Sequence, residues 1–305
     1  MSNTTPIQQN AVYTISVTSG VVANVILGGS SLFWRALGTI SPTTLLSYRI
    51  LISLITLILV MSILGKFSSF WSQLSYKVVM IHAAAAILVA INWGTFIWAS
   101  IYGHVVESGL GYLIAPFVAI GVGIFILRDR LSIVRRSALL MIAACIIILL
   151  LHSGELSHWI YLVIGITWGG YAYLKKITTL DAFAGLLVET AILSLCLCLA
   201  LTITPVSLAL PQSLPHSTLA LLSTCGLFST IPLWLFARAA GNLPLSVMGF
   251  FQFVLPSTQL VVAFLFYQQQ ISTNTLLCFS VIWLSLLAIV TEPLVIHHQH
   301  NKRKL

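Results

Sequence analysis

Ten long apolar runs alternate with short polar connections along the chain, and this pattern leaves few folds open. The runs span residues 13–34, 43–64, 79–101, 107–127, 137–151, 159–175, 182–202, 217–239, 245–267 and 275–296. A helix needs about 20 apolar residues to cross the hydrocarbon core of a bilayer. Only 7% of the 305 residues are charged, whereas an ordinary soluble domain carries about 25%. We therefore expect an all-α polytopic membrane protein with ten transmembrane helices, and we exclude a soluble enzyme, a nucleic-acid-binding protein and a disordered chain.

The basic residues indicate which side of the membrane each connection faces. The chain has 14 Lys and Arg against 6 Asp and Glu, a formal net charge of +8. With a cytoplasmic N-terminus, twelve of the fourteen basic residues fall on the cytoplasmic side, as the positive-inside rule requires. The twelve are Lys66, Lys77, Arg128, Arg130, Arg135, Arg136, Lys175, Lys176, Arg238, Lys302, Arg303 and Lys304. We expect two cytoplasmic termini and no nucleic-acid partner. Residues 1–12 carry no Lys or Arg, so we expect no cleavable signal peptide.

The two halves of the sequence match weakly when one is shifted by 138 to 140 residues. The segment 96–99 (FIWA) falls on 234–237 (WLFA), and 111–112 (GY) falls on 249–250 (GF). Because each half has an odd number of helices, the second half must cross the membrane in the opposite direction. We predict two inverted five-helix repeats, residues 1–152 and 153–305, the second with a short basic cytoplasmic tail. Such repeats are typical of secondary transporters, with the substrate site near the midplane. A chance alignment of leucine-rich helices is the alternative, which the shared prolines and glycines disfavour.

Arg49 and Glu189 are the two Lys, Arg, Asp or Glu residues deep within apolar runs. A charge at the bilayer centre costs about 2.5–3.5 kcal/mol on insertion scales, so such residues are commonly functional. They are 140 residues apart, which is the repeat shift, and they are opposite in sign. We hypothesise that Arg49 binds an anionic group of a substrate, and that Glu189 binds a cationic group or a coupling proton. The alternative is that Arg49 extends to the outer headgroups and that Glu189 caps a neighbouring helix end.

Polar and aromatic residues within the runs are further candidates for a substrate-binding site. Aromatic side chains with one polar group suit a pocket for a flat organic solute. The candidates are Asn92, Trp93, Trp98, Tyr112, Trp168, Tyr171, Phe250 and Gln252. For Asn92 and Gln252 an interhelical hydrogen bond is an equally good explanation. Trp34, Trp71 and Trp159 lie near the ends of runs or between them, where we expect the interfacial aromatic belt.

Pro116 and Pro256 occupy matching positions in the two halves. A proline inside a helix removes a backbone hydrogen bond and bends or breaks the helix. We therefore predict that both are kinks or hinges beside the substrate cavity.

Motifs for catalysis are absent from the sequence, which has no P-loop, no His-Glu-x-x-His and no Gly-x-Ser-x-Gly. The five cysteines lie within apolar runs and lack metal-ligand spacing, so we expect small buried apolar residues. We expect no enzyme, no cofactor and no metal site. Without an ATP-binding motif, transport would draw its energy from a gradient.

Several stretches follow one another in a recognisable order over essentially the whole chain. They are 48–49 (YR), 92–99 (NWGTFIWA), 107–116 (ESGLGYLIAP), 171–176 (YAYLKK), 187–190 (LVET) and 249–256 (GFFQFVLP). They resemble the RarD branch of the EamA family, within the drug/metabolite transporter superfamily. The resemblance implies ten helices in two inverted EamA repeats, a bacterial inner membrane, and a permease of a family associated with chloramphenicol sensitivity or resistance. RarD-like proteins usually have Asn at the position of Ala115 and Gly-Glu at Gln268-Gln269, so substrate identity does not transfer.

We therefore expect a secondary transporter that moves a small organic metabolite or drug by alternating access. The resemblance implies that the fifth and tenth spans lie at the periphery, where they could form a homodimer contact. The alternative is a non-transporting membrane scaffold or assembly subunit. A scaffold would fill its midplane with Leu, Ile and Val, and would pair Arg49 and Glu189 or turn them outward.

Overall fold

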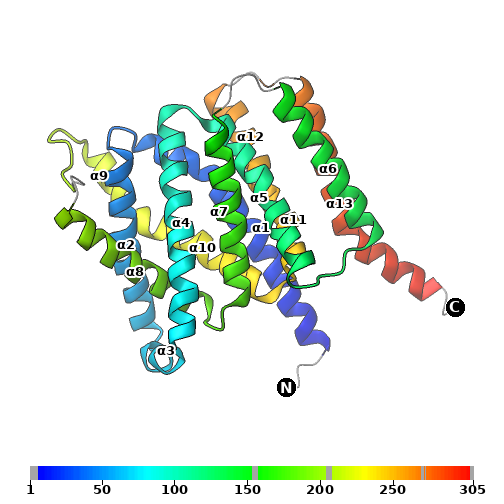
Figure 1. The fold of residues 1–305 in the computed structure, drawn as a ribbon, viewed down its shortest axis with the longest axis horizontal. Coiled ribbons are helices and arrows are strands. Elements are labelled where there is room, and N and C mark those ends of the chain that lie inside the picture. The colour runs from blue at the N-terminus through cyan, green and yellow to red at the C-terminus, as the bar shows by residue number, and fades with distance from the viewer. Residues whose placement is uncertain (1–5, 153–156, 204–207, 269–270, 272, 303–305) are drawn as a thin grey trace.

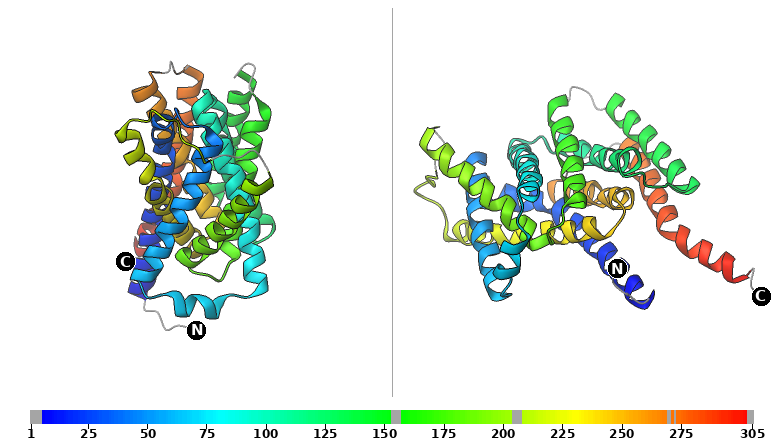
Figure 2. Two further views of the ribbon diagram at one scale, coloured as in Figure 1. Left: turned by 90° about the vertical axis from the view of Figure 1, so that its left-hand side faces the viewer. Right: turned by 60° about the horizontal axis from the view of Figure 1, so that its bottom comes forward.

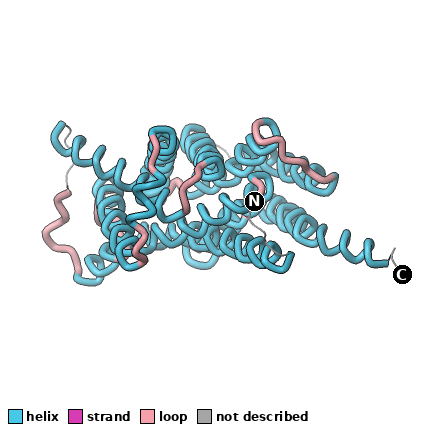
Figure 3. Tube along the Cα trace, turned by 90° about the horizontal axis from the view of Figure 1, so that it is seen from below, coloured by secondary structure: helices cyan, strands magenta, loops and turns pink. Residues whose placement is uncertain are grey.

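The computed structural model describes residues 6–152, 157–203, 208–268, 271 and 273–302. Gln269, Arg303 and Lys304 lie outside these ranges. All regular secondary structure in the described residues is helical (Figures 1 and 3). The helices are α1 (Pro6–Ala36), α2 (Pro42–Ile63), α3 (Phe67–Gln73), α4 (Tyr76–Tyr102), α5 (Val105–Phe125), α6 (Ile133–His152), α7 (His158–Ile177), α8 (Ala182–Ile203), α9 (His216–Ser223), α10 (Cys225–Asn242), α11 (Leu245–Gln252), α12 (Val254–Tyr267) and α13 (Thr273–Lys302).

Each of the ten apolar runs coincides with one helix or with two consecutive helices. Within the described residues, eight segments are long and apolar enough to cross a membrane. Two of these eight are the pairs α9–α10 and α11–α12. The other two expected spans are α7, which has Lys175 and Lys176 in its last turn, and α13, whose apolar stretch is Thr273–Ile289. The molecule is therefore a polytopic α-helical membrane protein.

The short helix α3 was not expected from the sequence. It lies between α2 and α4 at the lower edge of Figure 1 and buries Phe70, while Trp71 is 67% exposed. The connection between α5 and α6 and the connection between α7 and α8 lie at the same edge, as do the first turns of α1. Connections rich in basic residues thus gather on one side of the molecule, as the charge pattern predicts.

The packing of the helices places α4, α5 and α7 together, and α1 against α10 and α12. Helices α2 and α8 pack on each other and on α10. Helices α6 and α13 form a pair at one side of the molecule (Figures 1 and 2). This agrees with the expected peripheral place of the fifth and tenth spans.

Glycines allow α5 and α7 to approach closely. A methyl group added at Gly169 would lie 2.5 Å from Val118 Cβ, and one at Gly111 would lie 2.7 Å from Ile164 Cβ. Close backbone approach between helices at small residues is a common mode of membrane helix association. The glycines of α7 therefore serve packing, and they fix the position of the polar residues on the same helix.

The two matching prolines have different local structures. Helix α5 continues on both sides of Pro116, whereas Pro256 follows a break at Phe253 between α11 and α12. Pro256 is the third residue of α12. A backbone N–H at that position has no partner within its helix, so a proline there costs little.

Candidate functional site

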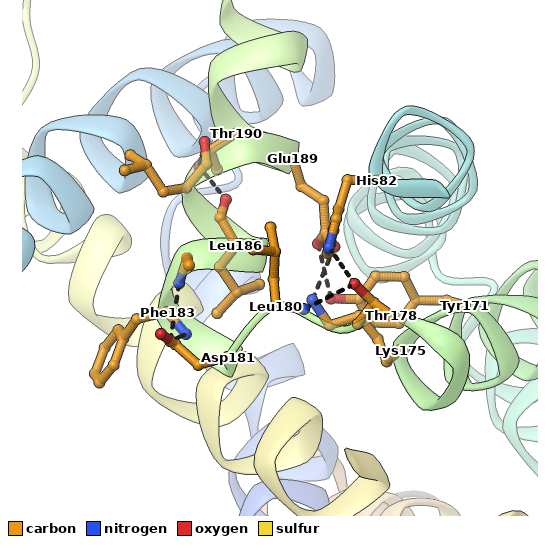
Figure 4. A network of polar contacts seen from close by, with 12 residues as sticks. His82, Tyr171, Lys175, Thr178, Leu180, Asp181, Phe183, Leu186, Glu189 and Thr190 are labelled. Atoms are coloured by element: carbon orange, nitrogen blue, oxygen red, sulfur yellow. Dashed lines mark hydrogen bonds and ion pairs between the residues drawn. The ribbon is translucent and has the colours of Figure 1, made fainter. Parts of the chain in front are cut away.

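Glu189 of α8 lies at the centre of a buried polar network (Figure 4). The Lys175 ammonium donates a hydrogen bond to Glu189 Oε1 at 2.8 Å, and the Tyr171 hydroxyl donates one to Oε2 at 3.1 Å. His82 Nδ1 lies 2.7 Å from Oε1. The carboxylate of Glu189 is thus held by side chains of α4 and α7, and its charge is balanced by that of Lys175.

The network continues from His82 to the start of α8. His82 Nε2 lies 2.7 Å from the Thr178 hydroxyl, in the connection between α7 and α8. Asp181 accepts hydrogen bonds from the backbone N–H groups of Phe183 and Ala184 at 2.9 and 3.1 Å, which makes it the N-cap of α8. A methyl group at Gly185 would lie 2.6 Å from the His82 ring. Glycine at this position therefore leaves the space that the imidazole occupies.

Arg49 of α2 is buried in a different way. Its side chain is 3% exposed, and its Cζ lies 3.8 Å from the ring centroid of Trp93 and 4.8 Å from that of Trp34. It makes no hydrogen bond and no ion pair with any residue that the structure describes, and its Nε is buried without a partner. Two indole rings stabilise the cation by roughly 2 kcal/mol or more, but they supply no counter-charge.

A small cavity connects the surroundings of the two charges. It is lined by Ser53, Leu57, Val89, Trp93, Leu186, Glu189, Thr190, Leu193, Thr230 and Leu233, from α2, α4, α8 and α10. It offers about 10 Å³ to the centre of a water-sized sphere, which is roughly the space of one water molecule. The hydroxyls of Ser53 and Thr230 and the indole Nε1 of Trp93 are buried without hydrogen-bond partners. Unpaired donors thus gather around the cavity beside Glu189, and one of them belongs to Trp93, whose ring contacts Arg49.

Asn92 joins three helices near this cavity. Its Nδ2 donates to the Ile164 carbonyl at 3.2 Å and to the Thr167 hydroxyl at 3.1 Å, and its Oδ1 accepts from the Tyr112 hydroxyl at 3.1 Å. Of the two explanations for Asn92, the structure shows the interhelical hydrogen bonds. The amide ties α4 to α5 and α7.

A series of aromatic rings in contact connects Tyr112 to Tyr171, which is hydrogen-bonded to Glu189. Trp168 packs edge-to-face on Tyr112, with centroids 6.1 Å apart, and stacks on Tyr171 at 5.6 Å. Phe236 of α10 covers Trp168 and Tyr171. Four of the predicted residues, Asn92, Tyr112, Trp168 and Tyr171, are therefore brought together with Glu189.

The remaining predicted residues lie in other surroundings. Trp98 belongs to an aromatic cluster with Tyr102, His104 and Trp159 at the end of α4. Phe250 and Gln252 are each 1% exposed on α11, and both amide atoms of Gln252 are buried without partners. The side chain of Gln252 therefore makes no hydrogen bond with the residues that the structure describes.

Three neighbours of the two charges were missed by sequence reasoning. In the sequence, the charge pattern explains Lys175 as an orientation signal, and the position of Trp34 assigns it to the interfacial belt. That assignment is wrong, because Trp34 is 1% exposed and covers Arg49. His82 carried a signal that could have been used, since it is a titratable residue inside an apolar run.

The cysteine prediction is correct in part. Cys145, Cys225 and Cys278 are buried, whereas Cys196 and Cys198 are exposed on α8, and all five are free thiols. Exposure of a cysteine on an outer face of a membrane helix means contact with lipid rather than with the core.

Fold and site together define a polytopic membrane protein with a buried charged centre between its helices, and its relatives are named as membrane transporters. The chain is 31% identical over 271 residues to the uncharacterized transporter YojE of Bacillus subtilis, covering 87% of this chain and 90% of that protein. It is 27% identical over 289 residues to the protein RarD of Escherichia coli, covering 94% and 97% of the two chains. To the protein RarD of Streptomyces exfoliatus it is 29% identical over 267 residues, covering 86% and 84%. The chain belongs to the RarD-like permeases of the EamA type, in the drug/metabolite transporter superfamily.

No family model matches the sequence. A crystal structure at 16% sequence identity superposes with a TM-score of 0.67 over 90% of this chain and 96% of its own chain. At that identity the likeness shows a shared fold alone.

Proposed function

We propose that this protein is a secondary transporter of the bacterial inner membrane that moves a small organic solute by alternating access, and that it is not an enzyme. The solute would bind near the midplane between two inverted repeats, with both termini in the cytoplasm. Relatives named as transporters support the general activity.

The packing of the helices supports the inverted repeats. Under the shift of about 140 residues, α1 corresponds to α7, α4 to α9–α10 and α5 to α11–α12. Helix α1 packs on α10 and α12, and α7 packs correspondingly on α4 and α5. The equivalent helices α2 and α8 pack on each other, as do α6 and α13. Two-fold exchange of neighbours is the pattern that an inverted repeat produces.

The observation that carries the proposed substrate class is the unpaired charge of Arg49. A buried charge without a counter-ion loses several kcal/mol of hydration free energy, which an ion pair must offset. Glu189 is already neutralised by Lys175, so it leaves no free anion for Arg49 and no free site for a cation. We therefore infer that the solute carries an anionic group, such as a carboxylate, which pairs with Arg49.

The residues around Arg49 would have distinct tasks. Trp34 and Trp93 would hold the guanidinium and contact a flat apolar part of the solute, while Ser53 and Thr230 would offer hydroxyls to its polar atoms. The network of His82, Lys175 and Glu189 joins α4, α7 and α8 on the cytoplasmic side. It would close that side of the pathway in the present conformation, and opening would require Glu189 to exchange Lys175 for a proton or another partner.

The scaffold alternative fits the structure less well. A scaffold would pair both buried charges, and here only Glu189 is paired. Unpaired hydroxyls, an indole N–H and a glutamine amide also occupy the interior, where a scaffold would place Leu, Ile and Val.

Flux into proteoliposomes tests the proposal. A panel of aromatic and aliphatic solutes in carboxylate, amide and amine forms is offered to the wild-type protein and to Arg49→Met. We expect carboxylates to be transported and Arg49→Met to abolish their flux. The matched control is Arg35→Met, an exposed arginine that stacks on Tyr267, which should retain flux. Equal transport of the amide forms by wild type and Arg49→Met would contradict the anionic substrate, and no flux with any solute would favour the scaffold.

A further inference from the structure

A cluster of arginines lies where α5 ends and α6 begins, away from the Arg49–Glu189 centre. We call Arg128, Arg130, Arg135 and Arg136 the basic corner. Arg135 forms an ion pair with Glu292 of α13 at 3.2 Å. Asp129 is also occupied, since its Oδ2 accepts the backbone N–H of Ser246 at the start of α11 at 2.9 Å.

The side chains of Arg130 and Arg136 have no ion pair or hydrogen bond with any residue that the structure describes, and both residues are exposed. The four arginines of the corner face two carboxylates, Glu292, which pairs with Arg135, and Asp129, so the corner retains an excess of positive charge. Its remaining cations are therefore available to an anion from outside the chain.

The start of α6 adds to this positive field. Helix α6 has no acidic residue in its first turn, and Arg135 and Arg136 stand in that turn instead. The N-terminus of a helix carries a partial positive charge, which favours anions and disfavours cations. Arginines at this helix end therefore repel its partial positive charge. A bound anion would be attracted both by the arginine side chains and by the helix end.

The corner encloses an open pocket with two kinds of wall. The pocket has a volume of about 420 Å³ and is lined by Asp129, Arg130 and Arg136 on the polar side, and by Ile124, Leu131, Leu139 and Leu140 on the apolar side. Leu140 is 72% exposed and the neighbouring Phe125 is 85% exposed, as expected for side chains that face lipid. The pocket therefore stands at the boundary between hydrocarbon and headgroups.

We propose that this pocket binds an anionic phospholipid from the leaflet that the basic connections face. Its phosphate would lie between Arg130 and Arg136, and an acyl chain would run along Leu139 and Leu140. Basic pockets at the cytoplasmic ends of transmembrane helices bind the headgroups of anionic lipids. A free phosphate would use the arginines but not the apolar wall, so the composition of the pocket favours a lipid.

A bound lipid would act on the transporter through Asp129. The connection that carries Arg130 also holds the start of α11 through the bond from Asp129 to Ser246. Helix α11 carries the buried residues Phe250 and Gln252. The lipid would thus steady the end of α5 relative to α11, and this inference does not depend on the identity of the transported solute.

Lipid binding to the purified full-length protein tests this proposal. The protein is delipidated in a neutral detergent and titrated with phosphatidylglycerol or phosphatidylcholine, and bound lipid is counted by native mass spectrometry. We expect phosphatidylglycerol to bind more tightly. Arg130→Gln/Arg136→Gln should weaken its binding about 25-fold, because each basic residue near an anionic lipid contributes roughly a factor of five.

Two variants serve as controls. Lys66→Gln/Lys77→Gln removes the same charge from exposed positions at the same edge and should bind phosphatidylglycerol as the wild type does. Arg130→Lys/Arg136→Lys keeps the charge and should retain most of the affinity, which separates lost attraction from a folding defect.

Three results would overturn the proposal. One is equal affinity for phosphatidylcholine and phosphatidylglycerol. Another is an equal loss of affinity in the Lys66→Gln/Lys77→Gln control. The third is displacement of the lipid by inorganic phosphate at similar concentration, which would make the pocket a site for a free anion.

Discussion

The Lys175 ammonium donates a hydrogen bond to Glu189 Oε1 at 2.8 Å, with both side chains 2% exposed. The pair joins α7 to α8, and His82 of α4 contacts the same carboxylate oxygen of Glu189. In a buried ion pair, loss of one partner leaves the other charged and unsolvated, so single replacements report that penalty rather than the value of the pair. The phenotype of a Glu189 variant must therefore be separated into stability and transport.

Glu189→Gln should lower the free energy of unfolding by about 3–5 kcal/mol, because it leaves the Lys175 charge buried without a counter-ion. Adding Lys175→Met to Glu189→Gln should restore most of that loss. Thermal or denaturant unfolding in detergent is measured for Glu189→Gln, for Lys175→Met and for the double variant, which together form a double-mutant cycle. If the double variant is as unstable as the sum of the single ones, the two charges do not act as a pair.

Arg49→Met should abolish transport and yet stabilise the empty protein. The desolvation of a buried, unpaired guanidinium costs several kcal/mol, and cation–π contacts with Trp34 and Trp93 return roughly 2 kcal/mol. We expect the free energy of unfolding to rise by about 1–3 kcal/mol in the absence of solute. Arg35→Met, at an exposed position where the guanidinium stacks on Tyr267, should instead lower it by about 0.5–1 kcal/mol. A destabilised Arg49→Met would mean that the arginine is held by the protein itself.

Long apolar runs predict the helices well because every backbone polar group in lipid must be satisfied within its own segment. The break at Phe253 was not predicted, since Pro256 indicates that α11–α12 is interrupted but not where. Arg49 and Glu189 were identifiable because charges are rare within the runs. Their partners were not, since Lys175 and Trp34 stand at helix ends, where orientation and the interfacial belt explain such residues equally well. Only the three-dimensional structure shows that Trp34 turns toward Arg49 and that Lys175 turns toward Glu189.

Gly169→Ala should destabilise the protein by about 1–3 kcal/mol, as overpacking commonly does. The added methyl group would lie 2.5 Å from Val118 Cβ and 2.9 Å from the Ala115 carbonyl oxygen, so α7 would have to move away from α5. Gly121→Ala is the matched control, because a methyl group there meets nothing within 4 Å. It should stabilise α5 by about 0.5–1 kcal/mol. Equal unfolding temperatures for the two variants would argue against tight α5–α7 packing.

Gln268→Gly should raise the free energy of unfolding. Gln268 ends α12 in the left-handed conformation, with φ 50° and ψ 31°, and its N–H donates to the Ala263 carbonyl. This conformation costs a residue with a Cβ about 1–2 kcal/mol, which glycine avoids. The greater freedom of glycine in the unfolded chain reduces that gain in stability. We expect a net gain of about 0.5–1 kcal/mol in thermal unfolding. Gln73→Gly, at the exposed end of α3, should lower the free energy of unfolding by a similar amount, because the backbone of Gln73 is helical and gains nothing from glycine. A loss at both positions would show that the Gln268 side chain stabilises the end of α12.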